Sequence, residues 1–258
     1  VELCELHARR CRTAELVLEV LAQIEPHLTP AALSSHLLPL VTGLITVQAA
    51  SSDRHRAALL VARLLRRLTS ATRRAEGVAW LVRTLSVAKS YQLRLVFVQF
   101  CAHLLSAAPR HGCSGHFFKS HGLVTALLLS ATDPVDIVRR SLCPLLPPIK
   151  RTLRLPADAQ LVELLHQSEG ALRADASACV RGAFAVVAAD LSAIDEASSQ
   201  HGDQPTEAER LDAERLVEEE ALVASEQFLR AAKSADASGR SSPSERSTPT
   251  SKCSSPRS

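Results

Sequence analysis

Two nine-residue stretches decide the fold: "DPVDIVRRS" at residues 133–141 and "DASACVRGA" at residues 175–183. Each places an aspartate six residues before an arginine and a valine immediately before that arginine. The apolar residues of the chain recur at the three- and four-residue spacing of amphipathic helices, as in Leu93, Val96, Phe97, Phe100, Cys101 and Leu104. The sequence therefore predicts a helical unit that occurs more than once.

The predicted units follow one another at a nearly constant distance. The helices form pairs, and the second helix of each pair carries an early arginine followed by an apolar run: Arg12, Arg54, Arg94, Arg139 and Arg181, which are 42, 40, 45 and 42 residues apart. A two-helix unit with a period of about 40 residues is typical of HEAT and armadillo repeats. We therefore expect an all-α solenoid of about five HEAT-like repeats.

Composition supports an all-α fold. Of the 258 residues 46% are hydrophobic, enough to bury a core, which excludes disorder throughout. Aromatic residues make up 3% and only nine glycines are present, so strands and tight hairpins lack their usual residues. Seven cysteines without a CxxC pair predict reduced thiols, which places the protein in the cytoplasm or the nucleus.

The sequence predicts neither a membrane-spanning protein nor a secreted one. No apolar run approaches the roughly 20 residues needed to cross a bilayer, and the N-terminus lacks the pattern of a signal peptide. The sequence begins at Val1 and contains no methionine, so we expect it to be part of a longer protein.

Charge and composition divide the chain into three parts. Residues 1–192, the predicted solenoid, hold 22 Lys/Arg and 14 Asp/Glu (net +8), whereas residues 193–258 hold 8 and 13 (net −5), which sum to the overall +3. Residues 193–233 are predicted to be a linker and an acidic amphipathic helix with an apolar stripe of Leu211, Leu216, Leu222, Val223, Phe228 and Leu229. A basic body with an acidic helix suggests an acidic partner or internal masking, although ordinary solvated helix faces would give the same charges.

Residues 234–258 are predicted to be a disordered tail. Ser, Pro, Thr, Lys and Arg dominate there without any apolar period. Ser242, Thr248 and Ser255 each precede a proline and lie near arginines, a local pattern read by proline-directed kinases. They are candidate phosphorylation sites, although such matches are common in a Ser/Pro-rich segment.

The opening motif also predicts local structure. Asp133 is a candidate N-cap and Pro134 suits the first helical position, with Val135 and Val138 toward the core. Six residues at 100° place Asp133 and Arg139 about 240° apart on a helix, too far for an intrahelical pair. They either pair between neighbouring repeats or stay separately solvated. Interior prolines break helices, and we expect a kink near Cys143 from Pro144, Pro147 and Pro148.

Few residues point to catalysis. No phosphate-binding glycine loop, nucleophile elbow, HExxH or kinase motif is present. The stretch "HGCSGH" offers His111, Cys113 and His116 as zinc ligands, but its spacing matches no common structural site and a loop between helices is the simpler reading. Cys4, His7 and Cys11 share one helix face, where core packing is the expected role.

Nucleic-acid binding is also weakly supported. Arginine clusters such as "RLLRRL" at residues 63–68 carry the necessary charge. The chain holds only six Phe, one Tyr and one Trp, so no aromatic platform for stacked bases is interleaved with them. We therefore predict no nucleic-acid partner, no membrane partner and no cofactor.

Four stretches resemble one family: "SYQLRLVFVQFC" (90–101), "FFK" (117–119), "DPVDIVRRSLCPLLPPIKRTLRLPAD" (133–158) and "EEEALVASEQF" (218–228). They are similar to the HEAT-repeat regulatory subunits of the protein phosphatase 2A and 4 group, over roughly residues 70–230. HEAT repeats as a class carry ladders of Asp and Arg, which the resemblance would assign to Asp133, Arg139, Asp175 and Arg181.

The resemblance also implies a function. A protein of this group is a non-catalytic scaffold that binds a Ser/Thr phosphatase catalytic subunit, of the phosphatase 4 or 2A type, and positions it toward substrates. The turns within each repeat would contact that subunit, with the exposed charges of Arg54, Lys89 and Arg94 as candidate contacts. A generic HEAT adaptor in transport or assembly is the main alternative, and a zinc-binding protein is the other.

Overall fold

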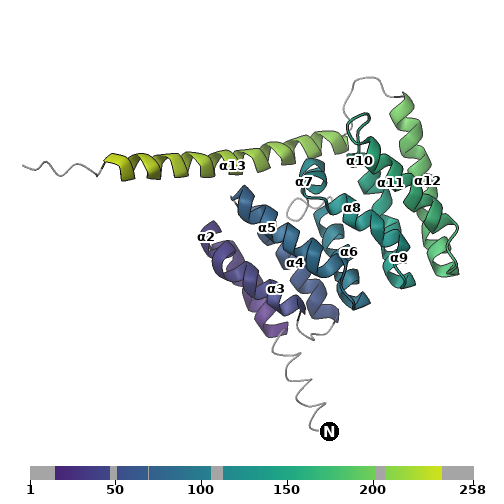
Figure 1. The fold of residues 1–258 in the computed structure, drawn as a ribbon, viewed down its shortest axis with the longest axis horizontal. Coiled ribbons are helices and arrows are strands. Elements are labelled where there is room, and N and C mark those ends of the chain that lie inside the picture. The colour runs from purple at the N-terminus through teal and green to yellow at the C-terminus, as the bar shows by residue number, and fades with distance from the viewer. Residues whose placement is uncertain (1–14, 47–50, 69, 106–112, 201–206, 240–258) are drawn as a thin grey trace, which may run out of the picture.

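The computed structural model describes residues 15–46, 51–68, 70–105, 113–200 and 207–239, and Figure 1 shows their arrangement. In these ranges every regular element is a helix and none is a strand. Successive helices run side by side in pairs, and the pairs stack in chain order from the N-terminal region to α12. The predicted all-α helical-repeat solenoid is confirmed.

The described residues contain four helix pairs. Residues 15–24 are helical and precede them. Three of the four first helices are divided into shorter segments: η1 Glu25–His27 with α2 Pro30–Ala32, η2 Leu33–Leu37 and α3 Leu38–Thr46; α5 Ala71–Leu81 with η3 Val82–Ser86; and α7 Gly115–Ser120 with α8 Leu123–Leu128 and η4 Leu129–Thr132. The fourth, α11 Ala159–Arg173, is continuous. The second helices are α4 Ser51–Arg67; α6 Tyr91–Leu105; α9 Asp136–Leu142 with η5 Cys143–Leu145 and α10 Leu146–Thr152; and α12 Ala178–Gln200. Arg12, which marks the fifth predicted repeat, lies outside the described residues.

The second helices form a continuous series in which each packs against the next. Ala58 of α4, Val98 of α6 and Cys143 in η5 are 0%, 1% and 0% exposed. Phenylalanines fill the larger spaces, and Phe97, Phe100 and Phe118 are fully buried. The buried side chains of all four pairs belong to one continuous core. Stacking thus gives each repeat the apolar contacts that a lone helix pair lacks.

The proline-rich segment after Arg139 behaves as its residues predict. Helix α9 ends at Leu142, three residues Cys143–Leu145 form a 3-10 turn, and α10 starts at Leu146. Pro144 lacks the N–H that an uninterrupted helix would need. The predicted kink near Cys143 is confirmed, and the two halves still serve as one second helix of the solenoid.

The start of α9 differs from the prediction. The helix begins at Asp136, with Val135 in the capping position and Pro134 outside the helix. The side chain of Asp133 accepts a hydrogen bond from the Val135 N–H at 2.8 Å, so it stabilises the turn before the helix rather than the helix itself. Val135 is half-buried against the core and Val138 is fully buried.

The predicted boundaries at the C-terminal side are too early. Helix α12 continues to Gln200, past the expected end at residue 192. Residues 193–200, "AIDEASSQ", contain neither glycine nor proline, so nothing in them interrupts the helix. The acidic helix, α13 Glu207–Gly239, extends beyond the expected end at residue 233. Residues 240–258, with Ser242, Thr248 and Ser255, lie outside the described residues.

Candidate partner-binding edge and its arginine ladder

Three arginines near the start of successive second helices are held in the same way by their own repeats. Arg94 Nη1 donates to the carbonyl oxygen of Ala88 at 2.7 Å, Arg139 Nη1 to that of Asp133 at 2.6 Å, and Arg181 Nη1 to that of Asp175 at 2.6 Å. In each case the acceptor lies six residues earlier, in the turn between the two helices. The six-residue spacing thus serves a side-chain to backbone bond within the repeat.

The other edge of the guanidinium binds the next repeat. Arg94 donates through Nε and Nη2 to the two carboxylate oxygens of Asp133, at 2.5 and 2.9 Å. Arg139 binds Asp175 in the same bidentate geometry, at 2.6 and 2.9 Å. Bidentate Arg–carboxylate pairs fix orientation as well as distance. We call this series of contacts the ladder, and it joins α6 to the turn before α9, and α9 to the turn before α12.

The ladder aspartates are ionised more readily than ordinary aspartates. Burial raises the pKa of Asp133, but hydrogen bonds from Arg94 and from the Val135 N–H outweigh it and hold the pKa below its usual value. Hydrogen bonds from Arg139 likewise hold the pKa of Asp175 below its usual value, against the opposing effect of burial. Both carboxylates are therefore charged at neutral pH and contribute to stability in that form.

The ladder lacks one carboxylate. The residue six before Arg94 is Ala88, so the turn before α6 has no counterpart of Asp133. Arg54 Nη1 instead donates to Oε1 of Gln92 at 2.8 Å, across the junction between α4 and α6. A neutral acceptor makes a weaker bond than a carboxylate, so this junction has a weaker polar contact than the two that follow it.

The structure changes the roles of two predicted contact residues. Arg54 is only 8% exposed, and the Arg94 side chain is 13% exposed and bound to Asp133. The expectation that Arg54, Lys89 and Arg94 are all exposed charges is therefore wrong for two of them, because they stabilise the stack. Lys89 is exposed in the turn before α6, between Val87 at 76% exposed and Tyr91 at 42%.

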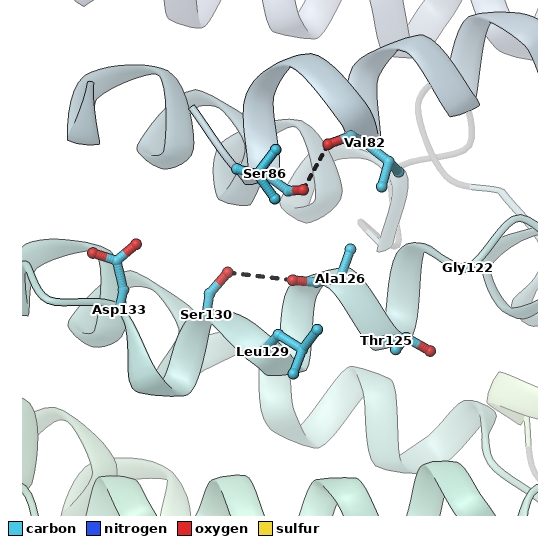
Figure 2. A pocket seen from close by; sticks show the side chains of 9 residues that line it. Val82, Ser86, Gly122, Thr125, Ala126, Leu129, Ser130 and Asp133 are labelled. Carbon is cyan, nitrogen blue, oxygen red and sulfur yellow. Dashed lines mark hydrogen bonds between the residues drawn. The ribbon is translucent and has the colours of Figure 1, made fainter. Parts of the chain in front are cut away.

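The ladder turns lie along one edge of the solenoid, and an apolar groove opens beside them. It has a volume of about 610 Å³ and runs between η3 on one side and α8 with η4 on the other. Figure 2 shows Val82 and Ser86 facing Ala126, Leu129 and Ser130, with Asp133 at one end. The hydroxyl groups of Ser86 and Ser130 donate to backbone carbonyls of their own helices. The groove therefore offers apolar contact rather than catalytic groups.

The predicted zinc ligands do not form a site in the described part of the chain. Cys113 is buried, its N–H donates to the Leu104 carbonyl, and burial raises the pKa of its thiol to about 12, which disfavours the thiolate that a metal requires. His116 is exposed. Among the residues that the structure describes, no three His, Cys, Asp or Glu side chains gather as metal ligands. His111, Cys4, His7 and Cys11 lie outside those residues.

Helix α13 binds the opposite edge of the solenoid, a contact that local sequence patterns do not reveal. Glu219 accepts hydrogen bonds from the Ser114 N–H at 2.9 Å and hydroxyl at 2.5 Å, at the start of α7. Glu218 lies 3.4 Å from Arg66 of α4. Three leucines of α13, Leu211, Leu216 and Leu222, are half-buried, whereas Phe228 and Leu229 of the same helix are exposed. Only the charge asymmetry of the chain hinted at this contact.

The chain shares part of its sequence with a named regulatory subunit. Over 93 residues, 36% of this chain, it is 36% identical to serine/threonine-protein phosphatase 4 regulatory subunit 4 of Homo sapiens and 33% identical to the protein of that name from Mus musculus. The matched residues make up 10% of each of those proteins. No protein-family model and no solved structure matches the chain. In the helices that the structure describes, none is long and apolar enough to span a membrane.

Proposed function

We propose that this protein is a non-catalytic regulatory scaffold that binds a Ser/Thr protein phosphatase catalytic subunit, of the phosphatase 4 or 2A type, and positions it toward its substrates. The observation that carries the proposal is the 36% identity over 93 residues with a phosphatase 4 regulatory subunit. The helical-repeat fold supports it, since solenoids present extended surfaces that suit protein partners. A scaffold acts by raising the effective concentration of enzyme and substrate near each other.

The ladder edge is the surface we assign to the catalytic subunit. The turns before α9 and α12 are held by bidentate Arg–Asp pairs such as Arg139–Asp175. The turn before α6 is held by Arg94, whose Nη1 donates to the carbonyl oxygens of Ala88 and Lys89, so exposed side chains on this edge keep a defined spacing. The turn before α6 presents Val87, Lys89 and Tyr91, which combine an apolar group, a cation and an aromatic ring. Aromatic residues are enriched among the residues that contribute most to interfaces. We therefore place the main contact on this turn.

Co-purification tests the proposal directly. The intact protein should retain phosphatase 4 or 2A catalytic subunit from a mixture of the two purified subunits, and K89E should reduce the amount retained. Arg151→Glu is the matched control, since Arg151 is an exposed cation on α10, at the C-terminal end of the second helix of the third pair and away from the ladder turns. If the wild-type protein retains neither subunit, the phosphatase assignment fails and a HEAT adaptor with other partners becomes the better explanation.

A further inference from the structure

The turn before α6 has the backbone of a ladder turn without its carboxylate. The Ala88 N–H donates to the Leu85 carbonyl at 3.3 Å. The Asp133 N–H makes the same bond, to the Ser130 carbonyl three residues earlier, at 3.2 Å. Arg94 binds the carbonyl of Ala88 just as the arginine of the next repeat binds the carbonyl of Asp133. Ala88 therefore occupies the position of a ladder aspartate.

Alanine at this position leaves Arg54 of the preceding repeat without a carboxylate. Arg54 is 8% exposed, and its Nη1 donates to the neutral side chain of Gln92 at 2.8 Å. Its Nε, the atom through which Arg94 and Arg139 bind their aspartates, is buried and has no hydrogen-bond partner among the residues that the structure describes. A buried donor without an acceptor is destabilising. The ladder edge therefore ties α4 to α6 less firmly than it ties α6 to α9.

On the opposite edge, α13 spans this same junction. Two consecutive residues of α13 contact different repeats: Glu218 lies 3.4 Å from Arg66 of α4, in the first helix pair, and Glu219 binds Ser114 at the start of α7, in the third. In Figure 1, α13 crosses the stack from the side of α10 toward that of α5. Of the two junctions that α13 spans, the one between α6 and α9 has its own bidentate pair, so the one between α4 and α6 depends more on α13.

We propose that α13 is a brace that takes the place of the missing carboxylate. It restrains the angle between the first helix pair and the rest of the solenoid, and breaking its contact with α4 lets this pair shift. The apolar core is continuous through the junction, so the shift is a small sliding of packed helices rather than a separation. Glu218 is 69% exposed, and an exposed ion pair contributes little, so this contact can be broken without unfolding a repeat. This role of α13 is independent of phosphatase binding.

Amide hydrogen exchange of the full chain, followed by mass spectrometry, tests the brace. The variant E218Q/E219Q should speed exchange in α3 and α4 by about two- to fivefold, and it should leave α9 and α12 unchanged. Glu220→Gln is the matched control, because Glu220 is the next residue of α13 and is exposed, and it should change neither region. Circular dichroism should show equal helicity for all of these proteins.

A second substitution distinguishes a brace from a merely local contact. Q92E replaces the neutral acceptor of Arg54 with a carboxylate of nearly the same shape, at an exposed position. Added to E218Q/E219Q, it should restore slow exchange in α3 and α4, whereas Gln160→Glu, at an exposed position on α11, should not. Unchanged exchange of α3 and α4 in E218Q/E219Q would overturn the proposal. So would an increase that E220Q also produces, or one that Q92E leaves in place.

Discussion

Replacing Arg139 with alanine removes three hydrogen bonds, two that join neighbouring repeats and one within its own repeat. Two go to the carboxylate of Asp175 and one to the carbonyl of Asp133. The side chains of Arg139 and Asp175 are 15% and 6% exposed, so the pair is largely shielded from water. R139A leaves the Asp175 carboxylate in place, where only the Ser177 N–H still donates to it. An uncompensated carboxylate at such a site is destabilising.

The burial of the pair sets the expected magnitude. Removing one member of a buried ion pair costs about 3–5 kcal/mol, whereas an exposed pair is worth about 0–1 kcal/mol. We expect R139A to lower the free energy of unfolding by about 3 kcal/mol, measured by urea denaturation followed by circular dichroism. The double variant R139A/D175A should cost less than the sum of the single changes, with a coupling energy of about 2 kcal/mol.

The neighbouring arginine supplies the control. Arg140 is exposed and lies on the same helix, and R140A should change the free energy of unfolding by no more than about 0.5 kcal/mol. If R139A and R140A have the same effect, or if the double variant is simply additive, the ladder does not stabilise the stack. The explanation of the six-residue Asp–Arg spacing would then fail as well.

Three further predictions concern pH, the core and α13. The pKa values of Asp133 and Asp175 lie below the ordinary aspartate value, so the two carboxylates contribute fully to the free energy of unfolding above about pH 5. This contribution is lost as pH falls through the lowered pKa values. The midpoint of urea denaturation should therefore drop below about pH 5, and it should drop less in the D133N/D175N variant. Val138→Asp buries an unpaired charge at a fully buried site and should cost about 4 kcal/mol or more, whereas Val186→Asp should be nearly neutral in the same denaturation assay. Glu219→Gln weakens the contact between α13 and the solenoid, so amide hydrogen exchange should speed up in α13 and not in α6.

The architecture was predictable from local patterns. The period of about 40 residues between arginines such as Arg94 and Arg139 is enough to predict stacked helix pairs, since each pair must bury its apolar face against the next. The kink at Cys143 follows from proline chemistry alone. Helix ends were less predictable, because α12 continues through residues that tolerate both helix and loop.

The environment of the individual charges was not predictable in the same way. Arg54 and Arg94 look like solvated residues at the start of a helix, and only the stacking of neighbouring repeats covers them. The contact of Glu219 with Ser114 joins residues 105 positions apart, which no helical period relates. A ladder can be suspected from spacing, but which residues it buries depends on how the repeats pack.

The ladder turns and the contact of α13 lie on opposite edges of the solenoid. The ladder turns lie before α6, α9 and α12, whereas α13 contacts the start of α7 and the end of α4, where the chain passes from one repeat to the next. Figure 1 shows α13 on the side away from the turn between α11 and α12. The contact of α13 with the solenoid therefore leaves the ladder edge uncovered in the described part of the chain, including the turn with the exposed Lys89 that we propose as the main partner contact.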